Sequence, residues 1–112
     1  MCGRLTLTST PDEVRRLFGY EDHPNFPPRY NIAPTQPLAI VAPVEGRRRF
    51  LLVRWGFIPD WAKNPADLPL MINARVETVA EKPSFRGAIR HRRMLVPTTG
   101  FYEWRQAKDG AT

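Results

Sequence analysis

The chain of 112 residues carries a net charge of +6, with 42% apolar and 25% charged residues. These values predict one globular domain over residues 1–112, exclude the disordered and fibrous classes, and favour a polyanionic partner such as nucleic acid. No apolar run approaches the roughly 20 residues that span a bilayer, and the N-terminus lacks a signal-peptide pattern. We therefore expect no membrane partner and a cytoplasmic, nucleoid-associated protein, or a nuclear one in a eukaryote.

A short helix is expected between Thr10 and Gly19. The sequence TPDE (10–13) has the form of a capping box with proline at the first helical position, and Gly19 is a suitable stop. One face of this helix is apolar and is expected to be buried; it consists of Val14, Leu17 and Phe18.

A surface loop and then a β-hairpin are expected next. Residues 23–37 include five prolines and predict the loop. Residues 38–42 and 50–55 are short β-branched or aromatic runs, and Glu45-Gly46 between them is typical of a hairpin turn.

The second half of the chain predicts a helix and three short strands. The helix is expected from Pro83 to about Arg90, with Phe85, Ala88 and Ile89 facing inward. The strands are expected over residues 71–76, 94–97 and 101–105. Trp55 and Trp104 are expected in the core, because large aromatic residues in short strands usually pack inward.

The end of the chain has the residues of a hairpin turn, Ala107-Lys108-Asp109-Gly110. No returning strand follows it. We therefore expect residues 101–105 to lack a partner strand, and the chain to be a fragment with an open sheet edge.

Cys2 is the single cysteine, so no internal disulfide is expected and a reducing compartment is favoured. Methionine aminopeptidase generally removes Met1 when residue 2 is small. The exposed α-amine, with a pKa of about 7.7 to 8.0, can attack an aldehyde to form a Schiff base, and the adjacent thiol can close on the imine to form a thiazolidine. The alternative interpretation is an inert thiol in the core.

Six blocks in the chain resemble the SRAP family of SOS-response-associated, abasic-site processing proteins, and they occur in the family's order. They are MCGR (1–4), RYNIAPTQ (29–36), WGFIPDWA (55–62), INARVET (72–78), EKPSFR (81–86) and LVPTTGFYEW (95–104). The resemblance implies an α+β fold, β-rich with curved, barrel-like mixed sheets and a few short helices. Only the N-terminal part of the family's domain is expected in residues 1–112.

The resemblance also implies a function in DNA damage repair and the SOS response. The protein is expected to recognise abasic sites in single-stranded DNA and to form a covalent thiazolidine crosslink through Cys2, which shields the lesion. Lyase or peptidase-type hydrolase activity is expected to accompany this chemistry. The full-length protein is expected to be monomeric.

The family's catalytic residues correspond to Cys2, Asn73 and Glu103. A carboxyl group near the hemiacetal of a closed abasic sugar would speed ring opening, and Glu103 suits this if it is partly buried between Tyr102 and Trp104. Asn73 can hold sugar hydroxyls or position the Cys2 amine without adding charge. The structural alternatives are an outward strand residue for Glu103 and a turn residue for Asn73.

The family's DNA-binding positions combine phosphate-binding cations with apolar surfaces for unpaired bases. Ala62 differs from relatives that carry a second tryptophan there, so stacking is expected to be weaker on that side. The basic run 90–93 either touches DNA or is a solvated helix end. The positions carried over are Gly3, Arg4, Pro34, Trp61 and Arg75.

The family's catalytic histidine belongs to a downstream His-Asp-Arg motif that this sequence does not contain. His23 and His91 do not match it and are expected to be neutral surface residues. We therefore expect this 112-residue form to bind DNA but to react slowly or to fold incompletely.

Two other functions remain open from the sequence. One is a cysteine-type peptidase that removes its own Met1 or cleaves other proteins; the other is a non-catalytic binding module for modified bases or single strands. One cysteine and two separated histidines lack metal-ligand spacing, and no Gly-rich phosphate loop is present. We therefore expect no metal and no cofactor.

Overall fold

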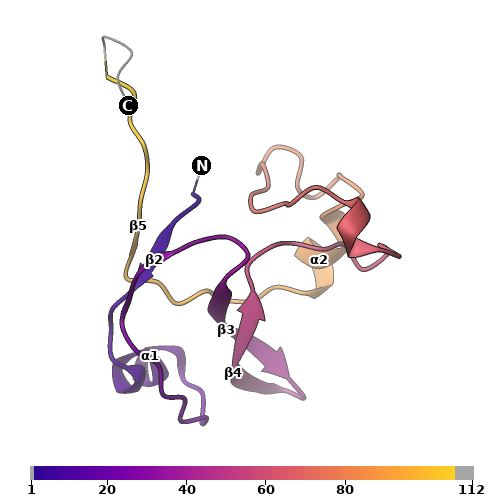
Figure 1. The fold of residues 1–112 in the computed structure, drawn as a ribbon. Helices are drawn as coiled ribbons and strands as arrows, with labels where there is room; N and C mark the ends of the chain where they lie inside the picture. Colours follow the sequence, from indigo (N-terminus) through magenta and orange to yellow (C-terminus); the bar gives the residue numbers. More distant parts are fainter. Residues whose placement is uncertain (1, 108–112) are drawn as a thin grey trace.

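Five strands form two antiparallel sheets in the computed structural model, which describes residues 2–107 (Figure 1). Two α-helices and one 3-10 helix accompany them in this part of the chain. The elements are β1 (Leu5–Leu7), α1 (Pro11–Phe18), β2 (Arg29–Ile32), β3 (Pro37–Val44), β4 (Arg47–Arg54), η1 (Pro65–Asp67), α2 (Arg86–His91) and β5 (Gly100–Phe101).

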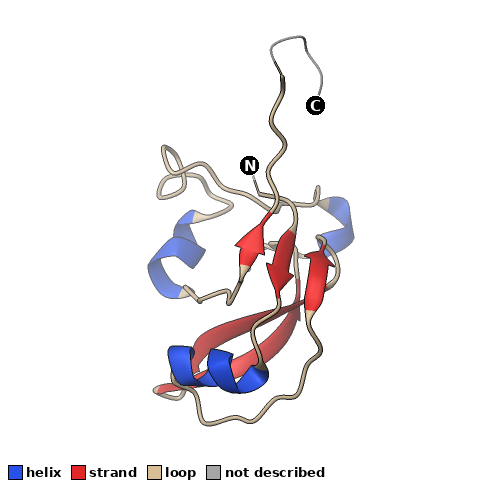
Figure 2. Ribbon diagram, turned by 90° about the vertical axis from the view of Figure 1, so that its left-hand side faces the viewer, coloured by secondary structure: helices blue, strands red, loops and turns tan. Residues whose placement is uncertain are grey.

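The three-stranded sheet has the order β2-β1-β5, so the N-terminal strand is its centre. Leu5 lies opposite Ile32 of β2 on one side and Phe101 of β5 on the other. Figure 2 shows the three strands side by side below the N-terminus. Because β1 is paired on both sides, the residues that immediately precede it are held at the end of the sheet.

The second sheet is the β3–β4 hairpin, in which Pro37 pairs with Arg54 and Val44 with Arg47. Glu45 and Gly46 both have positive φ, 51° and 79°, as the two central residues of a type I′ turn require. The predicted turn is therefore confirmed. The strands are longer than predicted because their pairing continues to the turn on both sides.

Helix α1 begins and ends where its capping residues predict. The Thr10 hydroxyl accepts a hydrogen bond from the Glu13 backbone N–H at 3.2 Å, and such a cap stabilises a helix by about 1 kcal/mol. Gly19 ends the helix in the left-handed conformation, with φ 72°. Val14 is buried as expected, but Leu17 is 78% exposed, so the buried face is narrower than predicted.

The core joins β1, β2, β3 and α1, and each large aliphatic side chain buried there contributes roughly 1.5 to 3 kcal/mol. Cys2 and Trp55 are partly buried against it, which supports a core position for Trp55. Trp104 is 76% exposed, so its predicted core position is wrong. The buried residues are Leu5, Leu7, Val14, Tyr20, Ile32, Leu38, Ala39, Ile40 and Val41.

Three predicted segments differ because strand pairing depends on distant partners. Residues 23–37 are not only a loop, since β2 lies within them and pairs with β1. Residues 71–76 form no strand; Met71 makes a single bridge to Phe57. Residues 94–97 likewise contribute only Leu95, which bridges to Val41 of β3.

The last two predicted elements are shorter than expected. The second helix begins at Arg86 instead of Pro83, although Phe85, Ala88 and Ile89 are partly buried. Residues 101–105 do not form a strand throughout, since β5 is Gly100–Phe101. This strand does have a partner, β1, contrary to the prediction. The predicted turn at 107–110 lies almost wholly outside the described residues.

The α+β prediction with few short helices is confirmed. Every strand pairing in residues 2–107 is antiparallel, and the two sheets do not close into a barrel there. None of the helices in the described part of the chain has the length and apolar character that a membrane span requires.

Candidate functional site

The N-terminal residues are held at the end of β1 by the sheet. Beyond the paired residues of β1 and β5, the Tyr102 backbone N–H donates to the Arg4 carbonyl at 3.0 Å. Figures 1 and 2 both show the chain after β5 running beside the N-terminus. The fold therefore brings the segment of Glu103 alongside that of Cys2, although the two are about a hundred residues apart in sequence.

Asn73 contacts Cys2 directly. Its side-chain amide donates to the Cys2 carbonyl oxygen at 2.9 Å across a sequence separation of 71 residues. The loop of Asn73 is fixed nearby, because the Phe57 backbone N–H donates to the Met71 carbonyl at 2.7 Å. The structure thus brings together two of the three predicted catalytic residues.

The Cys2 side chain is a free thiol that is partly buried against the core. Its sulfur lies 3.9 Å from the Arg4 carbonyl oxygen, close enough for a weak S–H donor contact. The Asn73 contact holds the Cys2 carbonyl, and the Arg4 contact holds the Cys2 thiol. Such contacts limit the positions that the backbone nitrogen and the thiol can adopt.

Glu103 is exposed between two exposed aromatic residues, Tyr102 and Trp104. The Tyr102 hydroxyl donates to the Tyr30 carbonyl at 2.9 Å, which ties this segment across β1 to β2. The partial burial on which its predicted acid–base role depended is absent from the described structure. Its segment lies beside the N-terminal residues, because the Tyr102 N–H donates to the Arg4 carbonyl.

Two arginines near Cys2 have guanidinium groups that pair with no carboxylate in residues 2–107. Arg4 is exposed, and within the described residues its side chain donates only to the neighbouring Gly3 carbonyl, at 3.3 Å. Arg75 is exposed two residues after Asn73. A Cβ added to Gly3 would lie 4.0 Å from Ile72 Cδ1, an ordinary contact, so packing alone does not require glycine there.

Pro34 lies in a turn between β2 and β3 that Gln36 stabilises. The Gln36 side-chain oxygen accepts hydrogen bonds from the Ala33 backbone N–H at 3.0 Å and from Arg29 at 3.1 Å. The Thr35 N–H donates to the Trp55 carbonyl at 2.8 Å. Gln36 was not predicted as a site residue, although it belongs to the block RYNIAPTQ (29–36).

Trp61 is 56% exposed, and its indole N–H donates to the Pro83 carbonyl at 3.1 Å. The residue before it, Asp60, pairs with Arg92 at 3.3 Å. Neither Pro34 nor Trp61 is linked to Cys2 by a hydrogen bond within residues 2–107. The predicted apolar wedge residues therefore belong to loops separate from the Cys2–Asn73 contact.

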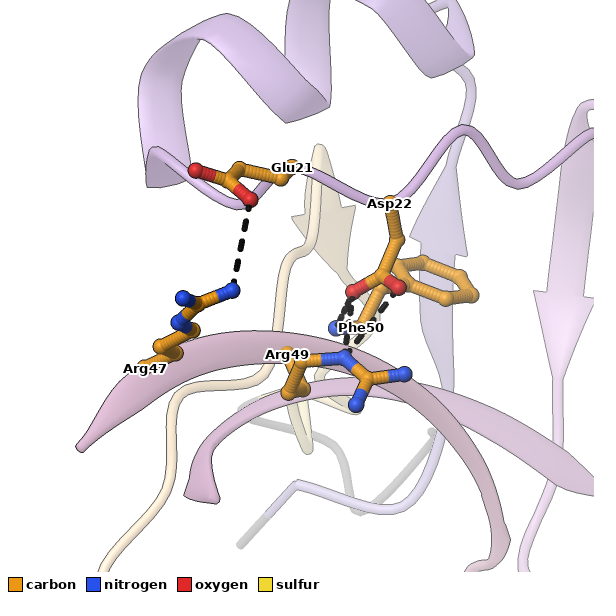
Figure 3. A network of polar contacts seen from close by, with 5 residues as sticks. All are labelled: Glu21, Asp22, Arg47, Arg49 and Phe50. Carbon is orange, nitrogen blue, oxygen red and sulfur yellow. Dashed lines mark hydrogen bonds and ion pairs between the residues drawn. The ribbon is translucent and has the colours of Figure 1, made fainter. Parts of the chain in front are cut away.

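A charged network lies away from these residues, between the hairpin and the segment after α1 (Figure 3). Arg49 Nε lies 3.0 and 3.1 Å from the two carboxylate oxygens of Asp22, and the Phe50 N–H donates to the same carboxylate. The Arg49 hydrogen bond and then the Phe50 N–H lower the pKa of Asp22, and the Asp22 contact raises the pKa of Arg49.

This network surrounds a cavity of about 850 Å³ in which positive and negative charges are balanced. Arg47 pairs with Glu21 at 3.8 Å, and Arg48 donates to the Phe18 carbonyl at 2.9 Å. Burial raises the pKa of the adjacent Tyr20. The arrangement fastens the hairpin to the segment after α1. The lining residues are Gly19, Glu21, Asp22, Val44, Glu45, Arg47, Arg48 and Arg49.

The sequence model for "SOS response associated peptidase (SRAP)" matches residues 1–112. Abasic site processing protein YoqW of Bacillus subtilis is 39% identical over 109 residues, covering 95% of this chain and 49% of the relative. Abasic site processing protein YedK of Escherichia coli is 30% identical over 115 residues, covering 97% and 50%. The chain therefore spans about half the length of the curated relatives it matches.

A solved structure shares the fold. The crystal structure of a phage-related protein from Bordetella bronchiseptica superposes with a TM-score of 0.75 at 28% identity. The match covers 94% of this chain and 48% of the other.

Proposed function

Because the chain belongs to the SRAP family, we propose that it captures abasic sites in single-stranded DNA through a covalent bond from Cys2. The observation that carries the proposal is the 2.9 Å hydrogen bond from Asn73 to the Cys2 carbonyl. This contact fixes the residue whose amine and thiol would react. Relatives named abasic site processing proteins support the same substrate.

The proposed reaction begins with hydrolysis of the Met1–Cys2 peptide bond, which frees the α-amine. The amine nitrogen attacks the aldehyde carbon of the ring-opened sugar, and one water molecule leaves as the imine forms. The thiol sulfur then adds to the imine carbon, and its proton moves to the nitrogen. The product is a five-membered thiazolidine, and no oxidant or reductant takes part.

Asn73 and Glu103 have separate roles in this scheme. Asn73 holds the Cys2 backbone, so that both reactive groups start near one position, and such positioning lowers the entropy cost of reaction. Glu103 transfers the proton that accompanies opening of the sugar hemiacetal. Its exposed position beside the N-terminal segment leaves it accessible to a bound sugar.

Binding of DNA in this scheme uses cations and a glycine near Cys2 in sequence or next to Asn73, together with apolar residues of two other loops. Arg4 and Arg75 bind phosphates beside the lesion, since neither is neutralised by a carboxylate in the described residues. Gly3 permits close approach of the backbone. The exposed Trp61 ring stacks against unpaired bases, as aromatic rings do in single-strand binding proteins, and the half-buried Pro34 provides an apolar contact. We propose that the full-length protein acts as a monomer.

The test is incubation with single-stranded DNA that contains an abasic site, followed by denaturing electrophoresis. A heat-stable crosslinked band is expected from the protein with a free Cys2 amine. The band should be lost in Cys2→Ala and in a protein with a blocked N-terminus. Equal crosslinking by these two proteins would overturn the mechanism.

A second candidate is a cysteine-type peptidase that removes its own Met1, as the family's description suggests. The N-terminal position of Cys2 favours aldehyde capture, because only there are an amine and a thiol on adjacent carbons. The protein can have both activities if it cleaves only the Met1–Cys2 peptide bond, because that cleavage frees the amine that captures the aldehyde. Cleavage of general peptide substrates without DNA would instead place peptidase activity first.

A further inference from the structure

The basic segment, residues 82–93, is not used by the site described above. It contains five Lys or Arg residues and no Asp or Glu, in a chain whose net charge is +6. Figure 1 shows its helix, α2, on the opposite side of the β3–β4 hairpin from α1. The segment therefore has a formal charge of +5 over twelve residues.

Three of its cations lie at helical spacing. Lys82, Arg86 and Arg90 are four residues apart, and the Arg86 N–H donates to the Lys82 carbonyl at 2.9 Å, which continues the turn into α2. Residues four apart share one helix face. Arg86 and Arg90 therefore lie on one face of α2, and Lys82, the third member of this basic row, lies one turn before the helix begins.

The other face of the segment packs against the protein. Phe85, Ala88 and Ile89 are partly buried, and the Phe85 ring lies 5.1 Å from that of Phe57. This packing fixes the orientation of the helix and leaves the basic row toward solvent.

Within the described residues, no side chain neutralises the row of Lys82, Arg86 and Arg90. Arg92 pairs with Asp60, and Arg93 donates to the Ile89 carbonyl at 2.6 Å. Lys82, Arg86 and Arg90 are exposed, and within residues 2–107 their side chains make no hydrogen bond or ion pair. A row that served only to hold the fold together would have such contacts, as the hairpin arginines do.

The exposed ring of Trp61 is attached to this segment. Its indole N–H donates to the Pro83 carbonyl, and the Asp60–Arg92 pair holds the same loop. On the other side, the Val79 N–H donates to the Arg75 carbonyl and the Lys82 N–H to the Thr78 carbonyl, which joins the segment to Arg75 through turns that carry Glu77 and Glu81. An aromatic ring beside a row of cations is the arrangement that single-strand binding requires.

We propose that Lys82, Arg86 and Arg90 bind consecutive phosphates of the single strand on the Trp61 side of the lesion. The inference rests on the proposed function, which places the lesion at Cys2 and Asn73. It adds a sequence-independent surface that holds the strand before and after reaction. This surface is distinct from the residues that contact the abasic sugar.

The experiment measures binding of an intact, fluorescently labelled oligonucleotide that has no abasic site, at several salt concentrations. The test variant is R86Q/R90Q. The control is R16Q/R47Q, which removes the same number of charges from exposed positions on α1 and the hairpin. Each lost phosphate contact reduces the slope of log affinity against log salt by about 0.7 for single strands. We expect R86Q/R90Q to lower the slope by about 1.4, with roughly fivefold to tenfold weaker binding at low salt.

The control should retain the slope of the unmodified protein. An unchanged slope in R86Q/R90Q, an equal fall in both variants, or no salt-dependent binding by the unmodified protein would overturn the proposal. Because the oligonucleotide has no aldehyde, the result does not depend on Cys2. A failure of the crosslinking chemistry would therefore appear in the abasic-site assay and leave this measurement unaffected.

Discussion

Within residues 2–107, Arg47 and Arg49 of the β3–β4 hairpin pair with carboxylates, whereas Arg4, Arg75, Arg86 and Arg90 do not. Arg49 and Arg47 contact Asp22 and Glu21, and Arg48 donates to a backbone carbonyl. Arg4 and Arg75 have no carboxylate partner in the described residues. Both regions are rich in arginine, so composition alone does not distinguish them.

The difference indicates two uses of the same side chain. A paired arginine has its charge balanced within the fold and fastens one element to another. An exposed, unpaired arginine adds little to folding and remains available to a phosphate. The pairing of each charge, more than its sign, therefore separates structural residues from candidate DNA contacts.

The largest expected effect is the difference in crosslinking rate between replacing the carboxylate of Glu103 and replacing that of Glu21. Glu103→Gln removes the proposed proton-transfer group, and crosslinking to abasic single-stranded DNA should slow by about a hundredfold. Glu21→Gln changes a similar exposed carboxylate beside the hairpin and should react at the unmodified rate. Rapid-quench time courses measure both rates. Equal rates for the two variants would remove Glu103 from the chemistry.

A smaller effect is expected for the amide that holds Cys2. Asn73→Ala removes a hydrogen bond worth about 1 kcal/mol, so the crosslinking rate should fall about fivefold. Asn64→Ala is the matched control, because Asn64 caps η1 through the Ala66 N–H and does not contact Cys2. Circular dichroism should show that both variants are folded. An unchanged rate in Asn73→Ala would show that positioning of Cys2 does not depend on this amide.

The smallest effect concerns acid stability of the hairpin network. The hydrogen bond from Arg49 lowers the pKa of Asp22 in the folded protein. The stability that Asp22 contributes is therefore fully present above its unfolded pKa of about 3.9. It is lost as the pH falls through the folded pKa. Asp22→Asn should lower the urea midpoint near neutral pH, and the deficit should shrink on acidification. A deficit that stays constant with pH would contradict this role. Glu21→Gln, whose pair is longer at 3.8 Å, should change the midpoint less.

Local signals in the sequence predicted the elements that depend on adjacent residues. Thr10 caps the start of α1 and Gly19 its end, and Glu45-Gly46 form the hairpin turn. Capping and positive φ depend on the residues themselves, so the sequence reveals them. The strands β1 and β2 have only three and four residues and depend on each other for hydrogen bonds. Periodicity does not reveal such short, mutually dependent strands.

The candidate site was predicted only through the family resemblance. Nothing in the local sequence relates Asn73 to Cys2, since the contact arises from a loop that Met71 and Phe57 hold in place. The exposure of Glu103 agrees with the alternative of an outward residue, whereas the exposure of Trp104 contradicts its predicted core position, because β5 ends at Phe101. Likewise, the contact between Trp61 and the basic segment follows from tertiary packing.

Mass spectrometry of the crosslinked product tests the central claim most directly. After nuclease and protease digestion, the modified peptide should begin at Cys2 and carry the sugar remnant with the loss of one water molecule, as a thiazolidine requires. Fragmentation should place the remnant on the Cys2 residue alone. A remnant on a lysine, or a modified peptide that retains Met1, would contradict the account.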